Sequence, residues 1–334
     1  MQAYMFAFTI GWWIWPAIIF FFIFVTAAGL RGLPYYRHLQ TGMQFLKSQD
    51  FESAVYCFQK ARDLQPYRWM PRDHMARAYL GQGNIEAAIR SFQEAVEIDP
   101  RRMRSQLGLG MCLLKQGDFQ KSVDVLHKVV EALPRHRDAH LALGEAYLSL
   151  GNFDEAQDAY MKGAPSGQSI PEILYGLAVI SLGKGEKKLA KQQLNEILVQ
   201  DTMNKDARLT LAAIARDEGD HAESLRLCEE ALENEPESSE TQLAVGISKA
   251  ALGRWKDARE HIEKAIRIDP GLGGADYHLA RAHSQLGEPA RAIESLRKSV
   301  ERGFASRIMI QEEPAFTPLR DVDGFESIIE KART

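Results

Sequence analysis

Residues 69–102 read WMPRDHMARAYLGQGNIEAAIRSFQEAVEIDPRR, with apolar residues such as Met75 and Phe92 on either side of a glycine-containing turn. Apolar residues recur three and four positions apart in both halves, which is the spacing of helices with one buried side. Gly83 lies where a first helix must stop and reverse, because glycine accepts the left-handed conformation that ends many helices. Pro100 ends a second helix, since proline lacks a backbone N–H and restricts the residue before it. The stretch therefore predicts two antiparallel helices.

The same unit recurs along most of the chain with a period of 34 residues. Prolines at 66, 100, 134, 236 and 270 are separated by multiples of 34. On that period the repeats begin at residues 35, 69, 103, 137, 171, 205, 239 and 273. The eighth and twentieth residues of every repeat are glycine, alanine or serine, although neither position was used to choose the register. The fifteenth is glycine in every repeat except the first, which has Gln49.

These columns predict how the repeats pack. Small residues at positions 8 and 20 let the two helices of a pair approach closely. Each pair exposes an apolar side that only the next pair can cover, so the pairs must stack. We expect an all-α fold in which residues 1–34 are a membrane anchor and its flank, residues 35–306 form an α-solenoid of eight repeats, and residues 307–334 form a C-terminal cap.

The repeat resembles the tetratricopeptide repeat family, which has small residues at positions 8 and 20, an aromatic or aliphatic residue at 24 and proline at 32. Residues 69–102 match best, through Ala76, Ala88, Phe92 and Pro100. The chain departs from the family pattern at position 4, where the family usually has tryptophan or leucine. The residues here are His38, Arg72, Gln106, His140, Leu174, Arg208, Gln242 and Asp276. Position 32 is not proline in repeats four, five and eight, and the sequence from Gly163 to Gly167 predicts an early end to the second helix of repeat four.

The N-terminal residues 1–30 contain no Asp, Glu, Lys or Arg. Within them, residues 12–30 read WWIWPAIIFFFIFVTAAGL, and as a helix these 19 residues would extend roughly 28 Å, close to the thickness of a bilayer's hydrocarbon core. We therefore expect a single membrane anchor, and its main residues are Trp12, Trp13, Trp15, Pro16, Phe20, Phe21, Phe22, Phe24, Leu30 and Arg31. A cleaved signal peptide and a buried core helix are the alternatives.

The charges beside the apolar segment predict its orientation. No Lys or Arg precedes it, whereas Arg31, Arg37 and Lys47 follow it, which favours an N-terminus outside and repeats in the cytoplasm. The three cysteines include no CxxC pair, which is typical of a reducing compartment.

The sequence contains no motif that indicates catalysis or the binding of a cofactor, a metal or a nucleic acid. The net charge of −4 argues against a nucleic-acid-binding protein, and no phosphate-binding loop, dinucleotide fingerprint, hydrolase elbow or zinc spacing occurs. His136 and His140 are four residues apart, but His136 falls at a turn between repeats, so no metal site is expected. We expect no catalysis, no cofactor and no small-molecule substrate.

The family resemblance implies that the first helices of the repeats line a concave groove that binds other proteins. Carried over position by position, the groove residues are Leu39, Met43, His74, Arg77, Arg104, Leu107, Met111, Leu141, Glu145 and Tyr175. Such a groove suits an amphipathic helix or an extended apolar segment of a partner. Several of these side chains could instead pack only between neighbouring repeats.

Three functional hypotheses follow. The first is a membrane-anchored scaffold or assembly factor, with the lipid bilayer and other proteins as partners. The second is an extracytoplasmic factor for envelope assembly or secretion. The third is a regulatory adaptor subunit of a membrane enzyme that acts through its own transmembrane helix.

Overall fold

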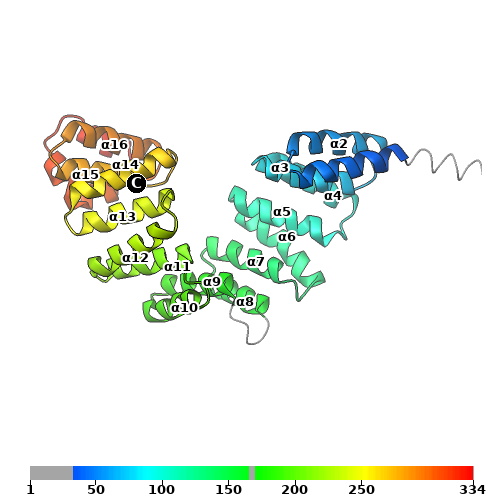
Figure 1. The fold of residues 1–334 in the computed structure, drawn as a ribbon, viewed down its shortest axis with the longest axis horizontal. Coiled ribbons are helices and arrows are strands. Elements are labelled where there is room, and N and C mark those ends of the chain that lie inside the picture. The colour runs from blue at the N-terminus through cyan, green and yellow to red at the C-terminus, as the bar shows by residue number, and fades with distance from the viewer. Residues whose placement is uncertain (1–32, 165–169, 334) are drawn as a thin grey trace, which may run out of the picture. The chain divides into compact units, whose positions relative to one another are not determined.

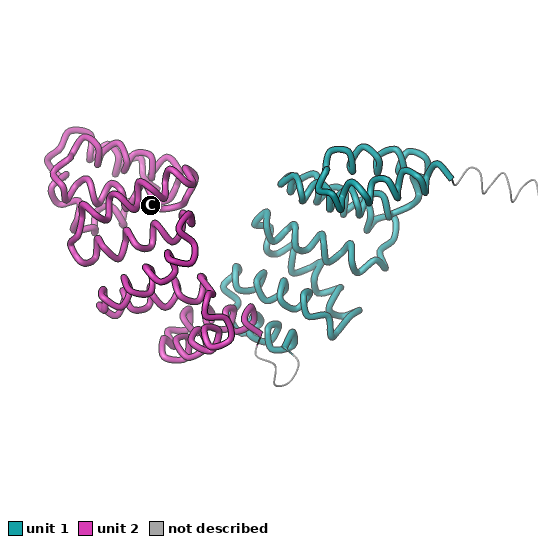
Figure 2. The backbone as a smooth tube through the Cα atoms, viewed as in Figure 1, with its two compact units in different colours: residues 1–168 teal, residues 169–334 magenta. Residues whose placement is uncertain are grey.

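The computed structural model describes residues 33–164 and 170–333, and in these residues every regular element is a helix and no strand occurs. The chain divides into two compact units, unit 1 (residues 1–168) and unit 2 (residues 169–334), shown in Figure 2. Successive helices in each unit pack against each other. This confirms an all-α helical-repeat fold.

In unit 1 the helices follow one another in pairs (Figure 1). They are the helix of residues 33–47, α2 (Phe51–Leu64), α3 (Met70–Gly81), α4 (Ile85–Ile98), α5 (Met103–Gln116), α6 (Phe119–Ala132), α7 (Arg137–Ser149) and α8 (Phe153–Gly163). The pairs α3–α4, α5–α6 and α7–α8 each fall inside one 34-residue repeat, and the first helix begins two residues before the first repeat, at residue 33. α8 ends at Gly163 after 11 residues, against 14 in α6, so the second helix of repeat four ends early as predicted.

Unit 2 begins with four further pairs (Figure 1). They are α9 (Pro171–Gly183) and α10 (Lys187–Gln200), α11 (Lys205–Asp217) and α12 (His221–Asn234), α13 (Ser239–Ala251) and α14 (Trp255–Ile268), and α15 (Ala275–Gln285) and α16 (Pro289–Glu301). Three short elements follow, α17 (Arg307–Glu312), the 3₁₀ helix η1 (Pro314–Leu319) and α18 (Phe325–Lys331).

The last residues of the chain close the end of unit 2. The three short elements bury Ile310, Phe316 and Phe325 in one core cluster with Tyr277 and Leu296 of the last pair. Polar contacts support this packing, because Ser284 and Gln285 of α15 both donate to the carbonyl of Ala315, at 2.6 and 2.9 Å.

The fifteenth residue of each repeat reverses the chain in a left-handed conformation. The glycines at positions 83, 117, 151, 185, 219, 253 and 287 all have positive φ. Gln49 takes the same place in the first repeat with φ 61°, and it is the one non-glycine with positive φ in the described ranges 33–164 and 170–333. A side chain at such a φ costs about 1–2 kcal/mol because its Cβ crowds the following carbonyl.

Replacing Gln49 with glycine is therefore expected to raise the free energy of unfolding by about 1 kcal/mol, partly offset by the greater freedom of glycine in the unfolded chain. Urea denaturation followed by circular dichroism measures the change. Gln44→Gly, in the preceding helix, is the matched control and is expected to lower stability by about 0.5–1 kcal/mol. Equal destabilisation by both variants would show that Gln49 is not strained.

The small residues at position 8 face the large residues at position 24 of the same pair. A methyl group on Gly110 would lie 2.6 Å from Leu126 Cδ2, and one on Gly144 would lie 2.7 Å from Tyr160 Cε1. Leu126 is 0% exposed and Tyr160 is 2% exposed, so neither can move aside easily. The close approach of the two helices therefore depends on these glycines.

The polar side chains at position 4 form hydrogen bonds with the backbone of the turn between repeats. In five repeats the side chain at position 4 donates to the backbone carbonyl of position 32 in the preceding repeat. The five bonds are Arg72 to Pro66 (3.0 Å), Gln106 to Pro100 (2.6 Å), His140 to Pro134 (3.0 Å), Arg208 to Thr202 (2.6 Å) and Gln242 to Pro236 (2.9 Å). Each of these carbonyls lies in the turn, two residues beyond the end of the preceding helix, so the polar side chain at position 4 supplies a donor for it and ties its repeat to that turn.

The expected membrane localisation needs correction. In residues 33–164 and 170–333 no helix is long and apolar enough to cross a bilayer. The described helices are too short and too polar on one side. For example, α4 has 14 residues, which extend about 21 Å, whereas the hydrocarbon core of a bilayer is about 30 Å thick. α4 is also amphipathic. This finding contradicts the expected single-pass localisation, which we withdraw together with the bilayer as a partner. The anchor residues from Trp12 to Arg31 lie outside the described residues.

Candidate functional site

Nine of the ten predicted groove residues lie on the first helices of unit 1, and Tyr175 lies on α9 of unit 2. The Tyr175 hydroxyl is 3.2 Å from Thr210 Oγ1, and the ring packs against the core cluster of α9–α13. Tyr175 therefore contributes to packing within unit 2.

Three of the unit 1 residues, Leu39, Met43 and Leu107, also pack between repeats. Leu39 is 4% exposed and belongs to a core cluster, against which Met43 packs. Leu107 packs against the cluster formed by α6, α7 and α8, and Leu141 is half-buried. The three packed side chains help to hold the stack together.

A buried carboxylate positions Arg77. Asp73 is 2% exposed, its Oδ1 accepts a hydrogen bond of 2.7 Å from Ser105 Oγ in the next repeat, and its Oδ2 lies 2.9 Å from Arg77 Nε. A buried carboxylate needs such partners, and this one joins two repeats while it orients the guanidinium. Within residues 33–164, the terminal nitrogens of Arg77 have no hydrogen-bond or ion-pair partner.

His74 lies one residue after Asp73 and stacks on Phe58, with ring centroids 5.2 Å apart. Burial lowers the pKa of His74, the Asp73 carboxylate partly opposes this, and the positive charges of Arg77 and Arg104 lower the pKa further. The imidazole is therefore neutral at pH 7, and the two arginines carry the positive charge of this region.

Met111 and Glu145 continue the exposed surface on the neighbouring first helices. Arg104 and Met111 lie seven residues apart on α5, so they share one side of the helix, and Met111 is 43% exposed. Glu145 lies on α7, which contacts α5 directly. Its side chain reaches solvent, yet burial by the surrounding protein raises the pKa of Glu145. We call this surface of His74, Arg77, Arg104, Met111 and Glu145 the first-helix face.

The two histidines four residues apart have structural roles. The backbone N–H of Ala139 donates to His136 Nδ1 at 3.4 Å and so caps α7, while His140 donates to the carbonyl of Pro134. The described ranges 33–164 and 170–333 contain no cluster of three or more His, Cys, Asp or Glu that could hold a metal ion.

Sequence comparison identifies the repeat. Two profiles described as tetratricopeptide repeat match the chain, one at residues 74–135 and 209–273, the other at residues 113–169 and 249–307. Together they cover more than half of the chain. The chain is a tetratricopeptide repeat protein. Proteins of this family are generally scaffolds that bind other proteins.

Several solved structures share this tetratricopeptide fold. A tetratricopeptide repeat protein from Parabacteroides merdae has 15% identity and a TM-score of 0.60, over 79% of this chain and 98% of that one. Yeast Tom70 has 16% identity and a TM-score of 0.63, over 88% of this chain and 64% of that one. The Cut9–Hcn1 structure has 15% identity and a TM-score of 0.61, over 83% of this chain and 54% of that one. A search of curated proteins finds no match.

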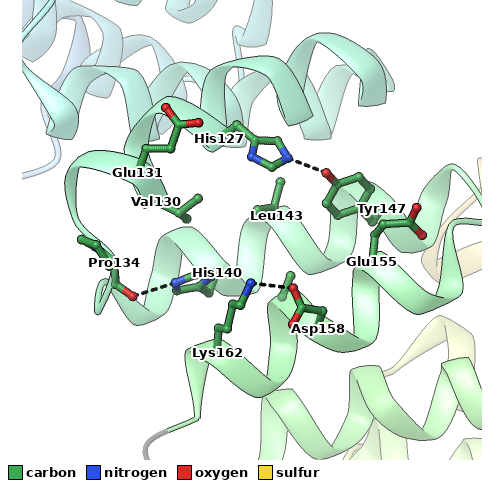
Figure 3. A pocket seen from close by; sticks show the side chains of 11 residues that line it. His127, Val130, Glu131, Pro134, His140, Leu143, Tyr147, Glu155, Asp158 and Lys162 are labelled. Atoms are coloured by element: carbon green, nitrogen blue, oxygen red, sulfur yellow. Dashed lines mark hydrogen bonds and ion pairs between the residues drawn. The ribbon is translucent and has the colours of Figure 1, made fainter.

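The structure also reveals a hollow that the sequence did not indicate. It has a volume of about 590 Å³ and lies among α6, α7 and α8 of unit 1 (Figure 3). Residues from His127 to Lys162 line it, and most belong to second helices. The repeat pattern marks only positions needed for packing, so it carried no signal for this surface.

Proposed function

We propose that unit 1 binds a segment of a partner protein along the first-helix face. Arg77 supports this proposal most directly. Its guanidinium is fixed by a buried carboxylate before any partner arrives, so little side-chain entropy is lost when a partner carboxylate binds. Arg104, exposed on the next first helix, supplies a second positive charge.

The chemistry of the face indicates the class of partner. Two arginines select acidic side chains, and the exposed thioether of Met111 adapts to apolar residues of varied shape. An amphipathic helix with an acidic edge and an apolar stripe meets both requirements. This role is binding and requires no catalytic group.

Replacing Arg77 and Arg104 with glutamine and Met111 with serine is expected to reduce capture of the partner by about thirtyfold or more, because arginine and well-packed apolar anchors dominate interface energies. The experiment immobilises the whole chain and quantifies captured proteins by mass spectrometry. A second variant, Arg104→Gln with Met111→Ser, keeps the Asp73–Arg77 pair and should still lose most of the binding.

The matched control changes two cations and one exposed methionine on second helices of the same unit. These are Arg90→Gln, Lys128→Gln and Met161→Ser, and Met161 is 61% exposed. This variant should capture the same proteins as the natural chain. Capture that survives in both first-helix variants would exclude the first-helix face as the binding surface.

A further inference from the structure

The hollow among α6, α7 and α8 lies outside the first-helix face, so what it binds goes beyond the proposed function. The side chains of Val130 and Leu143 and the ring of Tyr147 provide apolar surface, as Figure 3 shows. The hydroxyl of Tyr147 is 2.5 Å from His127 Nε2, which holds the ring in place. Its volume of about 590 Å³ is large enough for a long side chain.

The charged side chains around this hollow are mostly acidic. Glu131, Glu155 and Asp158 line it, against one cation, Lys162, which is already 2.7 Å from Asp158 Oδ2. Within residues 33–164, Glu131 and Glu155 have no ion-pair partner. The Tyr147 hydroxyl lies in this negative field. Burial raises the pKa of Tyr147, and the carboxylates of Glu155, Asp124 and Asp158 raise this pKa further.

A buried histidine is also part of the wall of the hollow. His140 lines the hollow and is 4% exposed. Its Nε2 lies 3.0 Å from the carbonyl oxygen of Pro134, and a carbonyl can only accept, so Nε2 carries the proton. The other ring nitrogen, Nδ1, is buried and has no hydrogen-bond partner in the described part of the chain. The acidic groups and the aromatic ring that line the hollow favour a cation with N–H donors.

Unit 2 contains the equivalent hollow two repeats later, among α10, α11 and α12, and there the chain supplies such a cation itself. Arg226 stands at the position of Asp158, and Arg208 at the position of His140. Arg226 binds Glu223, the equivalent of Glu155, through Nη2 at 2.6 Å and Nε at 2.7 Å. Glu230 pairs with both arginines. That hollow is smaller, about 280 Å³.

We propose that the α6–α8 hollow of unit 1 binds an arginine side chain from a segment of a partner protein. The guanidinium lies over the Tyr147 ring and pairs with Glu155, as Arg226 pairs with Glu223 in unit 2. Arginine suits this site because its planar group stacks on an aromatic ring and binds a carboxylate through two hydrogen bonds. The apolar part of the side chain contacts Val130 and Leu143.

The test titrates the whole chain, labelled with ¹³C-histidine, with the peptide acetyl-Gly-Arg-Gly-amide and follows the imidazole signals by NMR. We expect saturable shifts of the His127 and His140 signals. The same peptide with citrulline, which has the shape of arginine without its charge, is expected to bind about tenfold more weakly. Shifts of equal size and midpoint for both peptides would overturn the proposal.

Two variants locate the site. Asp158→Arg reproduces the arrangement of unit 2, where Arg226 occupies the carboxylate of Glu223, so Glu155 would already be paired and the arginine-dependent shifts should disappear. Glu155→Gln preserves the shape of an exposed side chain and is expected to weaken binding about fivefold, whereas Glu97→Gln on α4 should bind like the natural chain. Unchanged binding by Glu155→Gln would overturn the proposal, as would arginine-dependent shifts confined to His74, which reports on the first-helix face.

Discussion

Replacing Phe316 with alanine is expected to lower the free energy of unfolding of unit 2 by about 3–5 kcal/mol. Phe316 is 1% exposed in the C-terminal cluster, and its ring lies edge-on to Tyr277 at 5.5 Å and to Phe325 at 6.4 Å between centroids. Alanine would leave a cavity among these rings. The loss should spread to α15 and α16, because the C-terminal elements share one core cluster with both helices.

Hydrogen exchange read by mass spectrometry measures this effect for each unit separately. Peptides from α15 to α18 should exchange much faster in the variant, and peptides from α3 to α6 should be unchanged. Phe304→Ala is the matched control in the same unit, because Phe304 is 41% exposed and should cost at least about 2 kcal/mol less. Natural exchange rates in the Phe316 variant would show that the cap does not stabilise the last repeat.

The second large effect concerns the contact between Gly110 and Leu126. Leu126→Ala is expected to cost about 3–5 kcal/mol because the side chain is 0% exposed. Gly110→Ala is expected to cost about 1–3 kcal/mol because its methyl would lie 2.6 Å from Leu126 Cδ2. When both changes are combined, the new methyl enters the space that Leu126 leaves. The double variant should therefore be more stable than the sum of the two losses predicts, by at least about 1 kcal/mol.

Urea denaturation of the two single variants and the double variant gives the coupling energy. The matched control pairs Gly110→Ala with Leu194→Ala, because Leu194 has the same repeat position in unit 2 and is also 0% exposed. Those two losses should simply add, since the new methyl on Gly110 meets Leu126, whereas Leu194 belongs to the core cluster of α9–α13. If the losses from Gly110→Ala and Leu126→Ala simply add, the packing of α5 against α6 does not depend on the contact between these two residues.

Much of the fold could be predicted from repetition alone. The position-15 column predicted left-handed turns, and the structure has positive φ at all seven of its glycines and at Gln49. The predicted membrane localisation was wrong. It depended on residues 12–30, which lie outside the described residues. The helices that the structure describes contradict it, because none is long and apolar enough to cross a bilayer. Hydropathy of one segment is weaker evidence than a pattern repeated eight times.

The polar contacts could not be predicted. Position 4 looked like a departure from the family, and only the structure showed Gln106 donating to the carbonyl of Pro100 in the preceding repeat. Asp73 could be assigned to a helix on which Arg77, four residues later, is a local neighbour, but its hydrogen bond with Ser105, 32 residues away in the next repeat, could not be predicted. The hollow at Tyr147 could not be predicted from the repeat pattern, because the charged and aromatic residues that line it differ from repeat to repeat.

The sequence by itself determined the helix pairs, their 34-residue period, the turns between them and the small residues at their contacts. These features depend on neighbours within one or two turns of helix, so a local pattern is enough to specify them. The tertiary structure decided which charges pair across repeats, and why one hollow holds its own arginine while the other does not. Those outcomes depend on side chains brought together from different repeats, whose distances, burial and mutual charge no local pattern contains.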